Sequence, residues 1–357
     1  QGELSVLVDD FALLAKSLRP LPDKWHGLQD RELRSRRRYV DLIVNDEARD
    51  VALTRARIVS QLRREFESRG YIEVETPVLL NQATGALARP FETHHNALDL
   101  EMSLRIATEL FLKRLVVGGI ERVFEIGRIF RNEGIDATHN PEFTMLESYE
   151  AYADYGDIAS MVEEICAALA VAVHGTTSFT YNGRAIDLSP PFRRITMVDA
   201  VVEAIGRPIT FDDDMGALRA LAQQHGIETE PFWRHGKVIE ALFDELVADD
   251  IWEPTYVMDH PKETSPLARV HRDDPNLTER WELFIAGAEY ANAFSELNDP
   301  IDQRQRFESQ AAARVAGDLE AHPIDVDYIR ALEYGLPPTG GLGIGVDRLV
   351  MLLTDTH

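Results

Sequence analysis

The sequence predicts an α+β fold, in which an antiparallel sheet is flanked by helices. Two strand-like segments, 122–131 and 142–152, enclose a polar loop. Helical periodicity dominates from 155 to 250, and a glycine-rich strand at 340–348 leads directly into a helix. Strands that pair through hairpins, with long excursions between them, are typical of antiparallel sheets with helices packed on them.

The composition is that of a chain with a full hydrophobic core. Hydrophobic residues make up 45% of the 357 residues, which excludes a disordered chain and allows one large domain or two smaller ones. The single cysteine, Cys166, excludes a disulfide framework and suits a reducing, cytoplasmic compartment. No apolar run reaches the ~18 residues of a membrane span, so we expect no membrane contact from this chain.

The net charge of −24 is unevenly distributed. Taken alone it argues against a nucleic-acid partner, but the first 70 residues hold 14 basic and 12 acidic residues, so the acidic excess lies wholly after them. The arginine-rich segment 31–38 fits either a solvated helix face or a contact with phosphates or a second subunit.

The elements before the polar loop begin with a short strand at 2–8, which is followed by a proline-rich linker. One seven-residue strand is not stable alone, so we expect it to be the tail of an upstream domain. A helix at 50–69, stopped by a glycine, precedes a strand at 71–76. A further helix is expected at 108–117.

The elements after the loop are mostly helices at first, and strands then return. The expected helices are 161–173, 197–205, 215–224 and 237–248. The expected strands are 253–258 and 283–296, and a polar helix follows at 301–315.

Several common catalytic templates are absent from the sequence. It contains no P-loop, no H-E-x-x-H and no paired C-x-x-C. The glycine cluster at 340–345 reads G-G-x-G-x-G and lies too near the C-terminus for a dinucleotide-binding βαβ unit. Cys166 lies in an apolar helix, which favours a buried structural thiol.

Charged residues set into apolar strands are the remaining chemical signal. Phe143, Glu147 and Tyr149 share strand parity and so one face of a strand. Acids in such surroundings are costly unless they are paired or bound to a cation. Each acid alone fits a structural ion pair, but the set together favours a charged ligand. The set also includes Arg131, Glu133, His139, Asn140, Glu282, Glu289, Asn292 and Glu296.

Several segments resemble the class II aminoacyl-tRNA synthetases. Residues 130–147 resemble motif 2 of that family, 343–348 motif 3, and 70–77 motif 1. Residues 88–97 and 294–299 narrow the resemblance to the bacterial type of lysyl-tRNA synthetase. The resemblance runs over all 357 residues.

The resemblance implies a domain organisation. Residues 1–25 would be the tail of an N-terminal anticodon-binding OB-fold with its linker, most of which would lie upstream. Residues 26–357 would form the class II synthetase catalytic domain, with a mainly helical insertion at 155–250. The family also forms homodimers through motif 1, here 50–77, and continues somewhat past His357.

The resemblance also implies the reaction. The family activates L-lysine with ATP to lysyl-adenylate, releases pyrophosphate, and transfers lysine to the 3′ end of tRNA(Lys), with Mg²⁺ as cofactor. The nucleophiles belong to the substrates, so the protein supplies positioning and electrostatics. This agrees with the absence of a recognisable serine or cysteine nucleophile motif.

By resemblance, the ATP site joins arginines, carboxylates and one aromatic ring. Arg131 would hold the α-phosphate and the lysine carboxylate, Arg348 the γ-phosphate, and Phe143 would stack on adenine. Glu282 and Glu289 would hold Mg²⁺. The implied catalytic residues are Arg131, Arg348 and Glu282; Glu133, His139 and Asn140 would lie near the nucleotide.

By resemblance, the lysine site is rich in carboxylates. Gly85 and Glu109 would take the α-ammonium group. The ε-ammonium group would be held by Glu147, Tyr149, Asn292 and Glu296. A buried ammonium group needs acceptors and compensating charge, which these residues supply.

The predicted site imposes one geometric condition, and the sequence differs from the commonest family pattern at three positions. Glu289 has the opposite strand parity to Asn292 and Glu296, so one shared site requires a bulge or a strong twist. Positions that depart from the commonest family pattern, without an assigned role, are Thr108, Thr138 and Ala288.

Two alternative functions stay open. The same lysyl-adenylate chemistry could serve lipid lysylation or the lysylation of elongation factor P. The other alternative is a non-catalytic regulatory paralogue, which the presence of Arg131, Arg348 and Glu282 disfavours.

Overall fold

An eight-stranded sheet forms the framework of the larger of two structural units, Gln1–Ala56 and Arg57–His357. The computed structural model describes residues 4–22, 27–82, 84–86, 88–136, 139–315 and 324–356. Within these ranges, no helix is long and apolar enough to cross a membrane.

The first unit contains short helices and an extended segment. The strand expected at 2–8 is not formed in its described part, because 4–22 contain no helix or strand and offer it no pairing partner. The basic segment 31–38 forms ion pairs within and between two short helices. Arg34 and Arg38 pair with Asp41, and Arg36 pairs with Glu32. The helices of this region are α1 (Arg31–Arg36), α2 (Arg38–Val44) and α3 (Asp46–Ser68), the last of which confirms the helix expected at 50–69.

The large sheet has the strand order β1-β5-β6-β13-β12-β11-β10-β9. Its central pairs are antiparallel, as the sequence predicts, while β1–β5 and β9–β10 at the two edges are parallel. The strands are β1 (Ile72–Glu73), β5 (Arg122–Phe130), β6 (Glu142–Ala151), β9 (Arg193–Thr196), β10 (Thr255–Met258), β11 (Arg280–Ile285), β12 (Ala288–Ser295) and β13 (Thr339–Gly345).

One predicted strand, 283–296, is in fact a hairpin. Strands β11 and β12 are joined by a turn at Ala286 and Gly287, whose φ angles are 51° and 75°. Both strands lie inside the sheet, so the apolar run continues through the turn and hides the break.

The region 155–250 is mainly helical, as predicted, but it also contributes strands. The four predicted helices are α5 (Tyr155–His174), α6 (Met197–Ile205), α7 (Met215–Gln224) and α8 (His235–Leu246). Strand β9 and a hairpin of β7 (Ser178–Tyr181) and β8 (Arg184–Asp187) were missed because each strand has four residues. The hairpin turns at Asn182-Gly183, both with positive φ, and an Asn-Gly pair is a strong hairpin signal.

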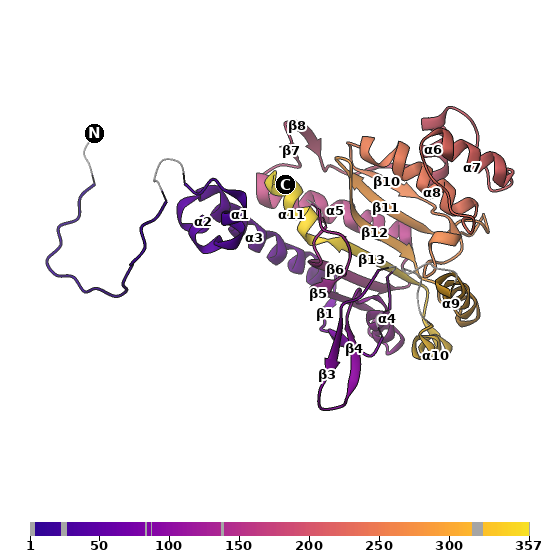
Figure 1. The fold of residues 1–357 in the computed structure, drawn as a ribbon, viewed down its shortest axis with the longest axis horizontal. Helices are drawn as coiled ribbons and strands as arrows, with labels where there is room; N and C mark the ends of the chain where they lie inside the picture. Colours follow the sequence, from indigo (N-terminus) through magenta and orange to yellow (C-terminus); the bar gives the residue numbers. More distant parts are fainter. Residues whose placement is uncertain are drawn as a thin grey trace. The chain divides into compact units, whose positions relative to one another are not determined.

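Helices cover both faces of the sheet and leave part of one face open. On one face, Trp281 and Leu342 pack with α5 and α11 (Val346–Thr354), where Cys166 is buried as predicted. On the other face, Val257 and Phe284 pack with α6–α8 at one end, and Tyr149 packs with α4 (Glu109–Val117) and α10 (Val326–Gly335) at the other. Figure 1 shows α6–α8 beside β10 and β11, away from α4, α9 (Pro300–Val315) and α10.

A small three-stranded sheet lies in the chain between β1 and α4. Its order is β2-β4-β3, with strands β2 (Leu79–Leu80), β3 (Glu92–His95) and β4 (Leu100–Leu104). The strand expected at 71–76 is shorter in the structure, where it forms β1 (Ile72–Glu73) and pairs with β5. Helix α4 agrees with the helix expected at 108–117.

Candidate active site

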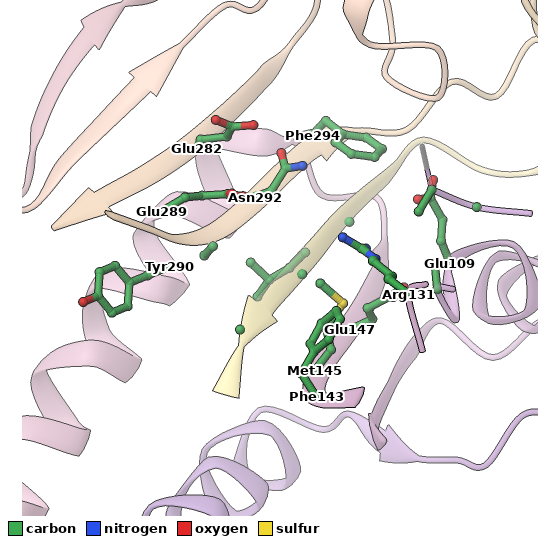
Figure 2. A pocket seen from close by; sticks show the side chains of 18 of the residues that line it. Glu109, Arg131, Phe143, Met145, Glu147, Glu282, Glu289, Tyr290, Asn292 and Phe294 are labelled. Carbon is green, nitrogen blue, oxygen red and sulfur yellow. The ribbon is translucent and has the colours of Figure 1, made fainter. Parts of the chain in front are cut away.

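A pocket of about 450 Å³ lies on the open face of the large sheet. Its lining comes from β6, β11, β12, β13, α4 and α11 and from the loops before β3, after β5 and before β11 (Figure 2). The structure brings every candidate site residue to this one pocket: Gly85, Glu109, Arg131, Glu133, His139, Asn140, Phe143, Glu147, Tyr149, Glu282, Glu289, Asn292, Glu296 and Arg348.

The floor of the pocket is the glycine-rich strand β13. Gly341 and Gly343 pair with Tyr149 and Glu147, so a side chain on either glycine would enter the pocket. A Cβ atom at Gly341 would collide with the carboxylate of Glu296 and lie 2.7 Å from the Tyr149 ring. At Gly343 the nearest atom would be 3.6 Å away. The glycine cluster therefore makes room for carboxylates.

Gly341→Ala is expected to destabilise the fold by about 1–3 kcal/mol, because a methyl group added to a packed site forces its neighbours to move. Gly343→Ala is the matched control on the same strand and should be nearly neutral, since its Cβ meets only ordinary contacts. Urea denaturation of both variants measures the difference. Equal stabilities of the two variants would contradict this account of the floor.

A β-bulge brings Glu289 to the pocket face. The pairing of β11 with β12 shifts between Leu283 and Phe284, so Asn292 lies opposite Glu282 while Glu289 lies opposite Phe284. Residues 282 and 284 share a face, and their partners 292 and 289 therefore share it too. The structure thus meets the condition that strand parity imposed on the sequence interpretation.

One end of the pocket is rich in carboxylates. The backbone N–H of Thr108 donates to Glu147 Oε1 at 3.0 Å, and the Tyr149 hydroxyl donates to Glu147 Oε2 at 3.2 Å. Burial raises the pKa of Glu147 to about 7. Burial also raises the pKa values of Glu109 and Glu296, which line the same end. Three carboxylates so close together favour a cationic ligand.

Lys113 is a charged residue of this region that sequence reasoning missed. It lies on α4, is completely buried, and donates to Glu109 Oε1 at 2.5 Å. It also forms an ion pair with Glu296. The signal was present, since Glu109 and Lys113 are four residues apart on one face of an otherwise apolar helix.

Arg131 lies between the two ends of the pocket (Figure 2). Its guanidinium carbon lies 5.3 Å from the centroid of the Phe143 ring, and its Nε donates to the carbonyl of Ile106 at 3.4 Å. The rest of the guanidinium fork can therefore bind a carboxylate or phosphate in the pocket. Phe143 presents a ring on the pocket surface, as its strand parity predicts.

The opposite end of the pocket is bordered by the polar loop. Arg348 donates to His139 Nε2 at 2.9 Å and to the carbonyl of Glu289 at 2.8 Å. The other ring nitrogen of His139, Nδ1, lies 2.7 Å from Asp136. Glu133 accepts a hydrogen bond from the backbone of Arg89 at 3.3 Å. These contacts hold an arginine and a histidine at the pocket rim.

Glu282 and Glu289 are the candidate metal ligands. Burial and the charge of Glu282 raise the pKa of Glu289 to about 7, although Arg280 pairs with Glu282 and Arg348 lies beside Glu289. No cluster of three or more metal-ligating side chains occurs among the described residues. Two carboxylates fit Mg²⁺, which commonly takes one or two protein carboxylates and completes its shell with phosphate oxygens and water.

Arg280 is a second pocket residue that sequence reasoning missed. It donates to Glu282 at 2.5 Å and to Asn292 Oδ1 at 3.1 Å, and so holds both candidate residues in place. It also donates to the Thr264 carbonyl and the Ser265 hydroxyl in the loop that walls the pocket. It is the first residue of β11 and shares strand parity with Glu282, so parity could have indicated it.

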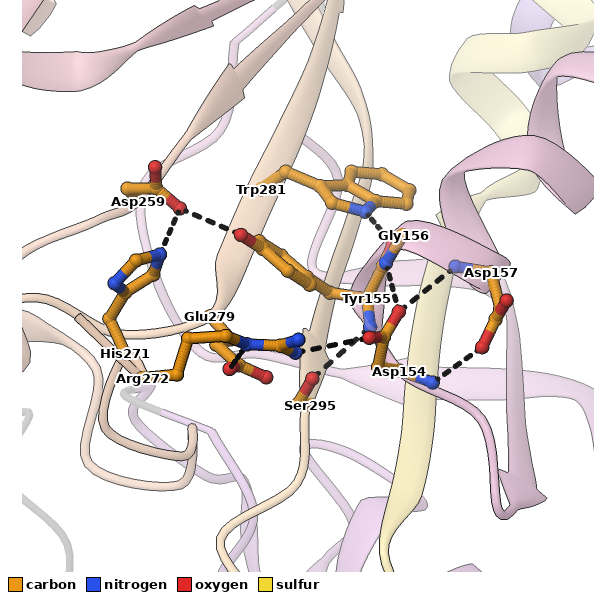
Figure 3. Close-up of polar contacts among 10 residues, drawn as sticks. All are labelled: Asp154, Tyr155, Gly156, Asp157, Asp259, His271, Arg272, Glu279, Trp281 and Ser295. Atoms are coloured by element: carbon orange, nitrogen blue, oxygen red, sulfur yellow. Dashed lines mark hydrogen bonds and ion pairs between the residues drawn. The ribbon is translucent and has the colours of Figure 1, made fainter.

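The loop between β10 and β11 is tied to the start of α5. Arg272 bridges Glu279 and Asp154, the latter of which caps α5, at 2.6 and 3.1 Å (Figure 3). Asp259, at the other end of the loop, accepts a hydrogen bond from Tyr155 at 3.2 Å. Because residues 264–268 of this loop line the pocket, the network fixes one pocket wall.

The three sequence departures lie in different surroundings. Thr108 contributes its backbone N–H to Glu147, as described above. Ala288 begins β12 opposite Ile285. Thr138 lies outside the described residues.

Comparison with known proteins shows which family this chain matches. The family model for class II tRNA synthetases (D, K and N) matches residues 30–357. The chain is 56% identical over 356 residues to a lysine–tRNA ligase of Enterococcus faecalis, covering 100% of this chain and 72% of that protein. It is also 55% identical to the proteins of the same name from Thermosynechococcus vestitus and Thermoanaerobacter sp. In each case the match covers 100% of this chain and 71% of the relative.

Proposed function

The chain belongs to the class II tRNA synthetases of the D, K and N group, and we propose that it is a lysine–tRNA ligase. It activates L-lysine with ATP, releases pyrophosphate, and transfers lysine from the adenylate to the 3′ end of tRNA(Lys). The observation that carries the choice of amino acid is the group of three carboxylates, Glu109, Glu147 and Glu296, at one end of the pocket.

Lysine lies along the floor of the pocket in this proposal. Glu109 and Gly85 hold the α-ammonium group, and Glu147 and Glu296 the ε-ammonium group; Tyr149 and Asn292 complete the ε-ammonium site. The lysine carboxylate meets Arg131 at the middle of the pocket. A neutral or acidic amino acid leaves buried carboxylates without a partner, which favours its rejection.

ATP occupies the other end of the pocket. The adenine ring lies on Phe143 near Glu133, His139 and Asn140, Arg131 binds the α-phosphate, and Arg348 binds the γ-phosphate. The lysine carboxylate then attacks the α-phosphorus in line with the leaving pyrophosphate, while Arg131 holds both reacting groups. Glu282 and Glu289 would hold Mg²⁺, which neutralises phosphate charge when bound.

The assembly and location follow the family expectation. We propose a homodimer through residues 50–77, which is supported by exposed apolar side chains in and near this segment: Ile72, Val78 and Leu79. We also propose that the protein works in the cytoplasm, where aminoacyl-tRNA is used.

Charging of tRNA(Lys) with labelled lysine tests the acceptor. We expect ATP-dependent transfer of lysine to the tRNA together with lysine-dependent ATP–pyrophosphate exchange. Exchange without transfer at any tRNA concentration would contradict tRNA as the acceptor. Absence of both activities would contradict catalysis by the chain.

The Mg²⁺ requirement should depend on pH through Glu289. Its pKa of about 7 means that protons compete with the metal below that pH, so the Mg²⁺ concentration for half-maximal activity should rise by up to about tenfold per pH unit below 7. Exchange rates measured from pH 6 to 8 report this concentration. Glu289→Gln is the control, since it keeps the titration of ATP and of Glu147 and removes that of Glu289. An unchanged pH dependence in this variant would contradict the assignment.

A further inference from the structure

Lys113 is a buried cation beside the amino-acid end of the pocket, and the proposed reaction does not use it. Its side chain is completely buried, and Lys113 is not among the pocket-lining residues, whereas its two carboxylate partners are. The ammonium group therefore lies behind the pocket wall. Ring centroids surround it at 5.5–5.9 Å and belong to Tyr149, Phe294 and Tyr328.

The environment keeps Lys113 charged. Burial alone would lower its pKa, but the charges of Glu109 and Glu296 outweigh burial and raise the pKa above its ordinary value. Aromatic faces also stabilise a nearby ammonium group. Conversely, the ammonium favours the ionised forms of Glu109 and Glu296, which burial opposes.

The charges of this end balance only when Lys113 is counted. When all three are ionised, Glu109, Glu147 and Glu296 carry three negative charges, and Lys113 leaves two uncompensated. Free lysine brings two ammonium groups, and its carboxylate is matched by Arg131. Burying uncompensated charge is costly. One bound lysine therefore balances the charge of this end of the pocket, and a further cation would leave an excess of positive charge.

The contacts of Glu296 agree with this division of charge. Lys113 approaches Oε2 of Glu296 from behind the wall. The Oε1 atom of Glu296 is buried, points to the glycine floor near Gly341, and has no hydrogen-bond partner among the described residues. One oxygen thus has an ion-pair partner in the protein, whereas the other has no partner among the described residues.

We propose that Lys113 is a positioning residue for lysine: it keeps Glu109 and Glu296 ionised and oriented, and it sets the net charge of the amino-acid site at two negative charges. This inference rests on the proposed lysine activation. Lys113 does not touch the substrate and acts through its two carboxylate partners.

Lys113→Met tests the proposal, since methionine fills a similar volume without charge. We expect the KM for lysine in ATP–pyrophosphate exchange to rise about 10- to 100-fold, because hydrogen bonds to charged groups are lost and a buried charge is left unmatched. The KM for ATP should change by less than about twofold. Equal changes in both constants would overturn the proposal.

Arg105→Met is the matched control. Arg105 forms an equally buried ion pair with Glu125 at 2.5 Å, and neither residue lines the pocket. The Arg105→Met substitution should lower the melting temperature without a selective change in the KM for lysine. A selective rise as large as that of Lys113→Met would show that loss of any buried cation has this effect, and would overturn the proposal.

A double variant tests the charge balance and covers the case in which Lys113→Met does not fold. Lys113→Met with Glu109→Gln returns the site to two negative charges. Its lysine KM should be no higher than that of Lys113→Met, and its melting temperature should be higher, although it lacks one more pocket carboxylate. Additive losses would overturn the proposal. Lysine-dependent exchange by the unaltered chain is measured first, and its absence would refute the proposed function instead.

Discussion

Arg131→Ala is expected to lower kcat/KM for lysyl-adenylate formation by about 10²- to 10³-fold, the effect typical of removing a preorganised group that stabilises transition-state charge. Arg131 lies in the middle of the pocket, near Phe143 and Glu147 (Figure 2). In the proposed reaction it contacts both the lysine carboxylate and the α-phosphate, so we expect its loss to affect both substrates.

Arg131→Lys separates charge from geometry. It keeps one positive charge but lacks the planar fork, so its activity should lie between those of the unaltered protein and Arg131→Ala. Lysine-dependent ATP–pyrophosphate exchange gives the constants, and melting temperatures control for folding. Full activity of Arg131→Ala would contradict the assigned role.

Glu296→Gln is expected to raise the KM for lysine by about 10- to 100-fold and to leave the KM for ATP within about twofold. The substitution keeps the shape of the side chain and removes its charge. Glu296 is buried at the carboxylate-rich end, whereas the proposed ATP contacts lie at the other end beside Arg348 and Glu289. The effect should therefore separate the two substrates.

Glu163→Gln is the control for a buried carboxylate elsewhere. Glu163 lies on α5, where it accepts hydrogen bonds from the Phe192 backbone and from Arg194, and it does not line the pocket. Its substitution should leave both KM values unchanged. Equal effects of Glu296→Gln on the lysine and ATP constants would contradict the assignment of Glu296.

Much of the fold could be predicted from sequence because its signals are local. The helices at 197–205 and 215–224 have the bounds that their periodicity predicts, and β5 and β6 enclose the polar loop as expected. The hairpin within 283–296 could not be seen, because two buried strands form one uninterrupted apolar run. The four-residue strands of 178–196 are too short for periodicity, although Asn182-Gly183 marked their turn.

The candidate site divides in a similar way. Residue types and the family resemblance together identified fourteen residues that the fold brings to one pocket. Parity correctly indicated that Glu289 needs a bulge. Lys113 and Arg280 each have one local partner, Glu109 and Glu282, but their contacts with Glu296 and Ser265 join distant segments. Those distant contacts leave no local pattern.

The most direct test of the account is ATP–pyrophosphate exchange with lysine and with norleucine, which has the same carbon chain without the ε-ammonium group. The central claim is that buried carboxylates select lysine by charge. It predicts a kcat/KM at least about 10³-fold higher for lysine, because norleucine brings no ε-ammonium group to compensate the remaining negative charge of Glu147 and Glu296. Comparable values for the two amino acids would contradict the claim.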